Sequence, residues 1–100
     1  MMTAMPMKTY TCLVCGYGDL EDPPEPGTVC PCCGTEFGYD DEDTSTAELR
    51  GRWLRDGARW WSPDVPAPPG WEPVAQLRNV GYTPTPAELS RIAAKGRGGV

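Results

Sequence analysis

A chain of 100 residues with 39% hydrophobic residues, twelve prolines and twelve glycines suits one small domain (residues 1–100) with a thin hydrophobic core. Its net charge of −5 argues against nucleic acid as a partner, because phosphate-binding domains usually carry a basic surface. The start, MMTAMPMK, lacks the apolar run of a signal peptide. No stretch resembles a membrane span of roughly 18 apolar residues. We therefore expect a cytoplasmic protein without a membrane partner.

Residues 8–43 are predicted to form a metal-binding head, because they contain all five cysteines. Four of these cysteines belong to two Cys-x-x-Cys-Gly turns. Two residues between the cysteines let a tight turn direct both sulfurs at one ion, and the following glycine allows a close backbone path. Two such turns supply the four thiolates of a closed tetrahedral site. The predicted metal ligands are Cys12, Cys15, Cys30 and Cys33.

The fifth cysteine, Cys32, lies inside the sequence CPCCG and is left over by this assignment. Adjacent Cys32 and Cys33 do not both fit the ligand positions of one turn easily. One interpretation makes Cys32 a small, weakly polar filler of the core. The other makes it a reactive or redox thiol, which would need exposure and thiolate character. Both interpretations stay open at the level of the sequence.

Zinc is the expected metal and iron is the alternative, because a four-thiolate tetrahedron suits both. The sequences CGY and CPCCG resemble the turns of rubredoxins, which would imply a single redox iron. A rubredoxin has a much longer segment between its turns, however. The chain has no histidine, which removes Ser–His and Cys–His catalysis. Four thiolates also leave no open metal position for water, so we expect no enzyme activity and no small-molecule substrate.

Residues 44–95 are predicted to be a helical and proline-rich packing segment. A helix within residues 44–61 begins with a capping box formed by Ser45 and Glu48 and ends at Gly57. Its apolar stripe consists of Leu49, Trp53 and Leu54.

After this helix, residues 62–73 are rich in proline and should wrap the surface in an extended form. A short helix is expected over residues 73–79, and another begins at Thr85 and Pro86 and ends at Gly96. Its apolar face consists of Leu89, Ile92 and Ala93. Residues 96–100 should be a disordered tail.

The roles of the aromatic and acidic residues can be interpreted in more than one way. Trp60, Trp61 and Trp71 either pin the proline-rich segment onto the core or form a partner surface. The aromatic residues near the cysteines should shield the metal; these are Tyr10, Tyr17, Phe37 and Tyr39. The acidic run at residues 40–43 lacks the spacing of a calcium loop. It is interpreted as a solvated run that also favours the following helix start.

Several longer stretches resemble one protein family: YTCLVCGYGDLEDPP, CPCCGTEFGYDD, ELRGRW, WWSP and APPGWEPVAQLRN. Together they resemble small bacterial CPCC-type cysteine-rich proteins, a zinc-ribbon-like and largely uncharacterised family. CLVC stands where the family often has CPxC, which leaves the ligands intact. The resemblance implies metal binding through Cys12, Cys15, Cys30 and Cys33, but no substrate.

The expected fold class is α+β. It combines a small zinc ribbon, with rubredoxin-like knuckles and a short β-hairpin, with a helix and a proline-rich C-terminal segment. β-prone pieces at residues 8–11 and 36–39 suggest the hairpin.

The expected function is that of a non-enzymatic zinc protein, with a structural four-cysteine site, acting in protein–protein interaction. The alternatives are a rubredoxin-like iron electron carrier and a nucleic-acid-binding zinc ribbon.

Overall fold

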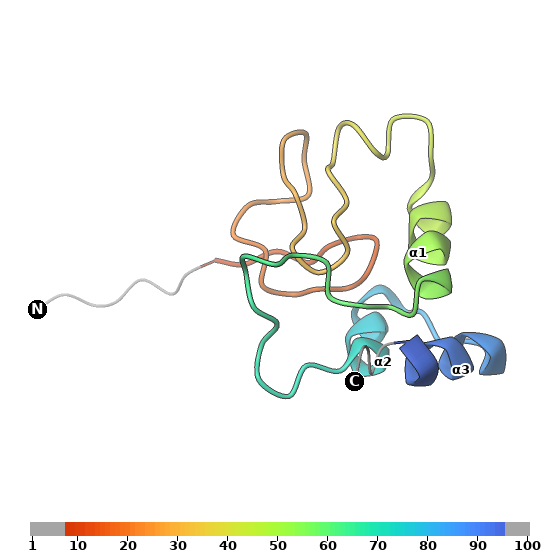
Figure 1. Cartoon of the computed structure of the whole chain (residues 1–100). Helices are drawn as coiled ribbons and strands as arrows, with labels where there is room; N and C mark the ends of the chain where they lie inside the picture. Colours follow the sequence, from red (N-terminus) through yellow and green to blue (C-terminus); the bar gives the residue numbers. More distant parts are fainter. Residues whose placement is uncertain (1–7, 96–100) are drawn as a thin grey trace, which may run out of the picture.

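Long loops around short helices make up the protein, as seen in this computed structural model of residues 8–95 (Figure 1). The cysteine-rich loops lie together, with α1 beside them and the remaining helices below in the view of Figure 1. The helical elements are α1 (Thr46–Arg55), α2 (Pro73–Leu77), the 3₁₀ helix η1 (Arg78–Val80) and α3 (Pro86–Lys95). The predicted tail at residues 96–100 and the predicted helix end at Gly96 fall outside the described residues.

The prediction of an α+β fold with a zinc-ribbon hairpin is wrong. Within residues 8–95 there is no β-strand. Two isolated antiparallel bridges, Tyr10 with Leu20 and Val29 with Glu36, are the extent of the β-pairing. Each bridge joins the two arms of one cysteine turn, so the β-prone pieces at residues 8–11 and 36–39 serve different turns. The connection between the turns contains three prolines, at positions 23, 24 and 26. Because proline has no backbone N–H to donate, these residues interrupt the hydrogen bonds that a longer β-hairpin would need.

The first helix forms as its local signals predict. Glu48 donates its backbone N–H to Ser45 Oγ at 3.1 Å, and Ser45 returns a backbone N–H to Glu48 Oε1 at 3.2 Å. These two bonds complete the capping box. The helix ends before Gly57, whose φ of 93° is in the left-handed region. The predicted stripe is buried: Leu49, Trp53 and Leu54.

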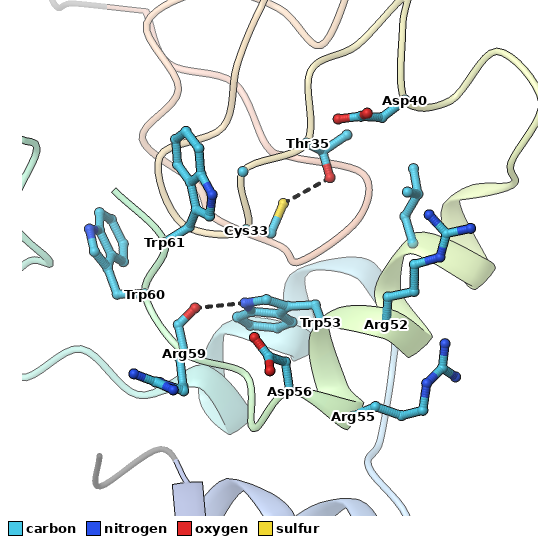
Figure 2. A pocket seen from close by; sticks show the side chains of 12 residues that line it. Cys33, Thr35, Asp40, Arg52, Trp53, Arg55, Asp56, Arg59, Trp60 and Trp61 are labelled. Atoms are coloured by element: carbon cyan, nitrogen blue, oxygen red, sulfur yellow. Dashed lines mark hydrogen bonds between the residues drawn. The ribbon is translucent and has the colours of Figure 1, made fainter. Parts of the chain in front are cut away.

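The proline-rich wrap, residues 57–71, returns from the end of α1 across the cysteine-rich loops to α2 (Figure 1). Trp61 donates its backbone N–H to Cys32 O, and Ser62 donates to Pro31 O, both at 2.9 Å. At the start of the wrap, Trp53 Nε1 donates to Arg59 O at 2.9 Å (Figure 2). These bonds attach the wrap to the second cysteine turn on one side and to α1 on the other.

The later helices also begin where expected, at Pro73 and Pro86. The segment predicted as one helix over residues 73–79 is divided between α2 and η1. In front of α3, Glu88 N–H donates to Thr85 Oγ1 at 3.2 Å. The predicted apolar face of α3 is realised only in part, because Ile92 packs against the core while Leu89 is 43% exposed.

The hydrophobic core surrounds the cysteines rather than a sheet. Side chains from the loops, from α1 and from α2 contribute to it. Its members are Cys12, Val14, Cys15, Tyr17, Leu20, Cys30, Cys32, Phe37, Leu49, Trp53, Leu54, Ala58 and Leu77. No helix in the described part of the chain has the length and apolar character needed to cross a membrane.

Candidate metal centre

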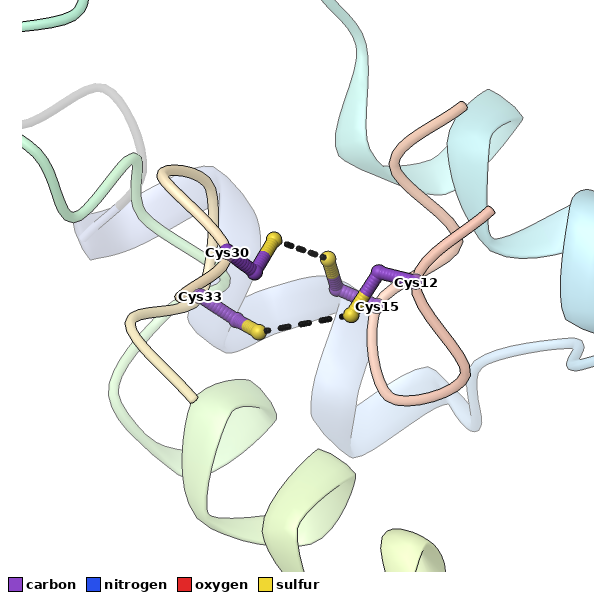
Figure 3. A group of neighbouring side chains, drawn as sticks. All are labelled: Cys12, Cys15, Cys30 and Cys33. Atoms are coloured by element: carbon purple, nitrogen blue, oxygen red, sulfur yellow. Dashed lines mark hydrogen bonds between the residues drawn. The ribbon is translucent and has the colours of Figure 1, made fainter. Parts of the chain in front are cut away.

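The four predicted ligand sulfurs lie together, facing one another across the two turns (Figure 3). The Sγ atoms all lie within 4.8 Å of one another. Cys12 Sγ is 3.8 Å from Cys33 Sγ, and Cys15 Sγ is 3.7 Å from Cys30 Sγ. A tetrahedral ion with metal–sulfur bonds of about 2.3 Å requires sulfur–sulfur edges of about 3.8 Å. The four cysteines could therefore hold a metal ion with little rearrangement.

The two cysteine turns have the same backbone hydrogen bonds. Gly16 N–H donates to Cys12 O at 3.0 Å, and Gly34 N–H donates to Cys30 O at 2.8 Å. Both glycines have positive φ, 87° and 79°, which glycine adopts without strain. In the first turn, Val14 N–H also points at Cys12 Sγ at 3.4 Å. Such an amide offsets negative charge on a thiolate.

The four thiols are close enough to ionise as one set. The sulfurs of Cys15, Cys30 and Cys33 lower the pKa of Cys12, because the neighbouring thiols donate to its thiolate. The contact with Cys12 raises the pKa of Cys15, and burial adds to that rise.

The donor set determines which ions fit. It consists of four sulfurs, and the residues that form it include no carboxylate. Thiolates select zinc or iron over hard cations such as calcium and magnesium. The geometry fits a tetrahedral ion of this soft class and does not discriminate between zinc and iron.

The four cysteines differ in their access to solvent. Cys12, Cys15 and Cys30 are fully buried, whereas Cys33 is only partly buried. The Cys33 thiol donates to Thr35 Oγ1 at 3.2 Å. One corner of the sulfur cluster thus faces the surface, and the other three corners face the core.

Cys32 stands apart from this cluster. It is fully buried, and its sulfur accepts a hydrogen bond from Gln76 Nε2 at 3.3 Å. The exposure that a reactive thiol needs is missing. The structure therefore favours the interpretation of Cys32 as a filler of the core.

Gln76 is an important neighbour that the sequence analysis missed. Its Nε2 also donates to Cys15 O at 3.0 Å, and its Oε1 accepts from Trp71 Nε1 at 2.7 Å. One side chain of α2 therefore contacts both cysteine turns and holds Trp71. No local motif marks this glutamine, because its partner Cys15 lies 61 positions earlier.

Two further side chains hold the first cysteine turn and were also missed. Arg50 donates from Nε to Val14 O at 2.7 Å and from Nη2 to Leu13 O at 2.9 Å. Asn79 donates from Nδ2 to Gly16 O at 2.8 Å. These bonds satisfy carbonyls that the turn itself leaves free, so α1 and η1 help to fix the position of the turn.

The aromatic residues divide into packed and exposed groups. Tyr17 and Trp60 meet edge to face with ring centroids 5.4 Å apart, and Trp60 meets Trp71 in the same way. Trp61, in contrast, is 56% exposed. Trp60 and Trp71 therefore pack the wrap onto the head, while Trp61 remains at the surface. The predicted shielding of the metal fails for Tyr39, which is 72% exposed.

The acidic run has a local structural role. Asp40 Oδ2 accepts from Glu36 N–H at 2.7 Å, and Asp41 Oδ1 accepts from Gly38 N–H at 2.7 Å. These carboxylates fix the loop that follows the second cysteine turn, a role that the sequence analysis did not assign to them.

Comparison with known proteins identifies two similar chains, both from Bacillus subtilis (strain 168). "Uncharacterized protein YoaQ" is 45% identical over an alignment of 42 residues, and the match covers 35% of this chain and 36% of YoaQ. The match thus spans about a third of the length of YoaQ. "Uncharacterized protein YozI" is 31% identical over an alignment of 83 residues, and the match covers 59% of this chain and 69% of YozI. The chain belongs to the family of YozI. No family model matches the chain, and no solved structure matches it.

Proposed function

We propose that this member of the YozI family is a small, non-enzymatic zinc protein with a structural four-cysteine site, and that it acts by binding another protein in the cytoplasm. The observation that carries the proposal is the spacing of the sulfurs, with edges of 3.7 and 3.8 Å that suit a tetrahedral ion. The motifs around the cysteines support the further proposal that the family corresponds to the CPCC-type proteins.

The position of the cluster supports a structural role for zinc. Three of its four cysteines belong to the hydrophobic core, so the ion would join the two turns at the centre of the molecule. Four thiolates complete the coordination shell and leave no position for a substrate. In such small sites the free energy of metal binding contributes directly to folding.

The candidate partner surface is the exposed part of the wrap. Trp61 is 56% exposed and Val65 is 45% exposed, and Trp60 Nε1 holds the loop between them through Val65 O at 2.6 Å. A tryptophan presented on a fixed loop is a common anchor in protein–protein interfaces. The net charge of −5 argues against nucleic acid in this role.

Metal analysis tests the proposed site. Protein purified from cells supplied with both zinc and iron should contain one zinc per chain. One iron per chain would instead favour the rubredoxin-like electron carrier, because the same sulfurs suit both ions. Reversible oxidation and reduction of the iron protein would then establish that alternative. Protein without either metal would contradict both proposals.

Capture of a partner tests the proposed surface. The wild-type chain and a Trp61→Ala variant would be used as baits, with Leu89→Ala as the matched control. Leu89 is also an exposed apolar residue, but it lies on α3. A specific partner should be recovered by the wild type and the control and lost with Trp61→Ala. Equal recovery by all three baits would contradict the assignment of this surface.

A further inference from the structure

A pocket opens between the second cysteine turn and α1 (Figure 2). It has a volume of about 650 Å³. Cys33 and Thr35 lie on one side of it, and Trp53 and Arg52 of α1 lie on the other, with Trp61 at its edge. This volume is sufficient for a small molecule to enter.

Cys33 is the one member of the sulfur cluster that lines this pocket. Figure 2 shows the Cys33 sulfur directed into the pocket, where it donates a hydrogen bond to Thr35 Oγ1 at 3.2 Å. Behind it, Cys12 Sγ lies 3.8 Å away and is fully buried. A molecule in the pocket therefore reaches Cys33 first, and it reaches Cys12 only past Cys33.

The pocket also carries positive charge. Arg52, Arg55 and Arg59 line it together with Asp40 and Asp56, so the formal charges leave an excess of one positive charge. No hydrogen bond joins the guanidinium groups to another residue drawn in Figure 2. The lining is therefore charged and polar, which suits the entry of a small polar molecule such as a peroxide.

We propose that Cys33 is an oxidation site through which a peroxide opens the metal centre, with Cys12 as the resolving cysteine. The proposal rests on the metal site proposed above. It goes beyond that site by assigning one ligand as the point of attack and one small pocket as the route.

The chemistry proceeds in two balanced steps. The Cys33 thiolate attacks one peroxide oxygen, the S–O bond forms, the O–O bond breaks, and the released hydroxide takes a proton to become water. The sulfur loses two electrons to the peroxide and becomes a sulfenic acid. The Cys12 thiolate then attacks Cys33 Sγ, the S–S bond forms, the S–O bond breaks, and the second hydroxide leaves and takes a proton from solvent to become water. An ion held by the four cysteines would thereby lose two thiolate ligands, Cys12 and Cys33, and would be released.

The order of oxidation is the first test. The full chain as purified would be exposed to hydrogen peroxide in steps, with dimedone present to trap sulfenic acids, and each cysteine would be quantified by peptide mass spectrometry. Label should appear at Cys33 at least about fivefold faster than at any other cysteine, because Cys33 is the partly buried cysteine that lines the pocket and access controls reactivity. Without dimedone, the first disulfide should join Cys12 and Cys33, and zinc release should follow it. Label spread evenly, or first label at a buried cysteine, would overturn the proposal.

The route through the pocket is tested with Arg52→Trp, which fills space at its edge, and with Arg91→Trp as the matched control. Arg91 is an exposed arginine of α3 that does not line the pocket. The pocket variant should slow labelling of Cys33 several-fold at unchanged metal content, and the control should not. Equal rates in both variants would contradict the route. Failure of the proposed metal site would appear separately, as absence of metal before any peroxide is added.

Discussion

Cys32 and Cys33 are neighbours in the chain, yet their sulfurs have different surroundings. The Cys33 sulfur lies 3.8 Å from Cys12 Sγ in the cluster, whereas the Cys32 sulfur accepts from Gln76 Nε2. The turn geometry separates them, because the side chains of Cys30 and Cys33 are the two in this turn that belong to the sulfur cluster. The surroundings of these two cysteines are therefore decided by the directions of their side chains, although the two residues are adjacent in the sequence.

Substitution of the cysteines should reveal this difference. Cys32→Ser should keep the metal, with affinity reduced less than about 10-fold, because a hydroxyl can accept the same bond from Gln76. Cys30→Ser should reduce affinity by more than about 100-fold, because removal of a ligand costs more than loss of a supporting contact. Competition with a chromogenic chelator measures both. If Cys32→Ser lost metal affinity to the same extent as Cys30→Ser, the ligand assignment would be contradicted.

The sequence predicts the four clustered sulfurs because each pair lies within one short turn. It does not predict Gln76, Arg50 or Asn79 as supports of the turns. Their partners lie 36 to 63 positions away in the chain. Such contacts depend on how α1, α2 and η1 pack, and no local spacing encodes that packing.

At the scale of the elements, α2 and the first cysteine turn approach each other closely at Gly16. A Cβ atom at this position would collide with the backbone carbonyl of Gln76. Gly16 also has a φ of 87°. The approach allows Gln76 and Asn79 to reach the turn, so the absence of a side chain at Gly16 is a condition for the docking of the C-terminal segment.

Gly16→Ala should therefore destabilise the protein by more than the strain of a left-handed residue, which is about 1–3 kcal/mol. Gly81→Ala is the matched control, because Gly81 has a φ of 69° but no atom within 4 Å of its added Cβ. The free energy of unfolding in urea, measured with metal bound, compares the two variants. A cost for Gly16→Ala no greater than that of the control would mean that α2 does not need this approach.

Within residues 8–95 the helices were predictable, and the absence of strands there was not. Each α-helix begins with a local signal: the capping box at Ser45 and Glu48, or the prolines Pro73 and Pro86. Strand pairing depends instead on which segments meet. Here each cysteine turn pairs its own two arms through a single bridge. The β-prone pieces at residues 8–11 and 36–39 therefore do not pair over a length that would make a strand.

At the scale of the whole molecule, the sulfur cluster and the hydrophobic core are one structure. Cysteines, α1 residues and Leu77 of α2 belong to the same buried cluster. A chain of this size has little apolar surface to bury. The ion would join the two cysteine turns within that core, so its loss should affect the entire fold.

Acid and chelators should accordingly unfold the protein together with metal release. Metal-bound thiolates have pKa values below that of a free thiol, so the stability that the metal contributes is present at neutral pH and is lost as pH falls. We expect the melting temperature and the near-ultraviolet circular dichroism of the tryptophans to fall in parallel with bound zinc between about pH 7 and pH 4. Neutralisation with zinc under reducing conditions should restore both. A fold that persists after the metal has left would contradict a structural role for the ion.

The bonds of Gln76 have a practical consequence. This side chain holds Trp71 at one end and contacts both cysteine turns at the other. Cobalt in a four-sulfur site has visible absorption bands that respond to small changes at the sulfurs and their hydrogen-bond donors. A partner that moves Trp71 or α2 would therefore alter the spectrum of the cobalt-substituted protein. The chain would act as its own optical indicator, so that binding could be followed as a colour change without an attached dye.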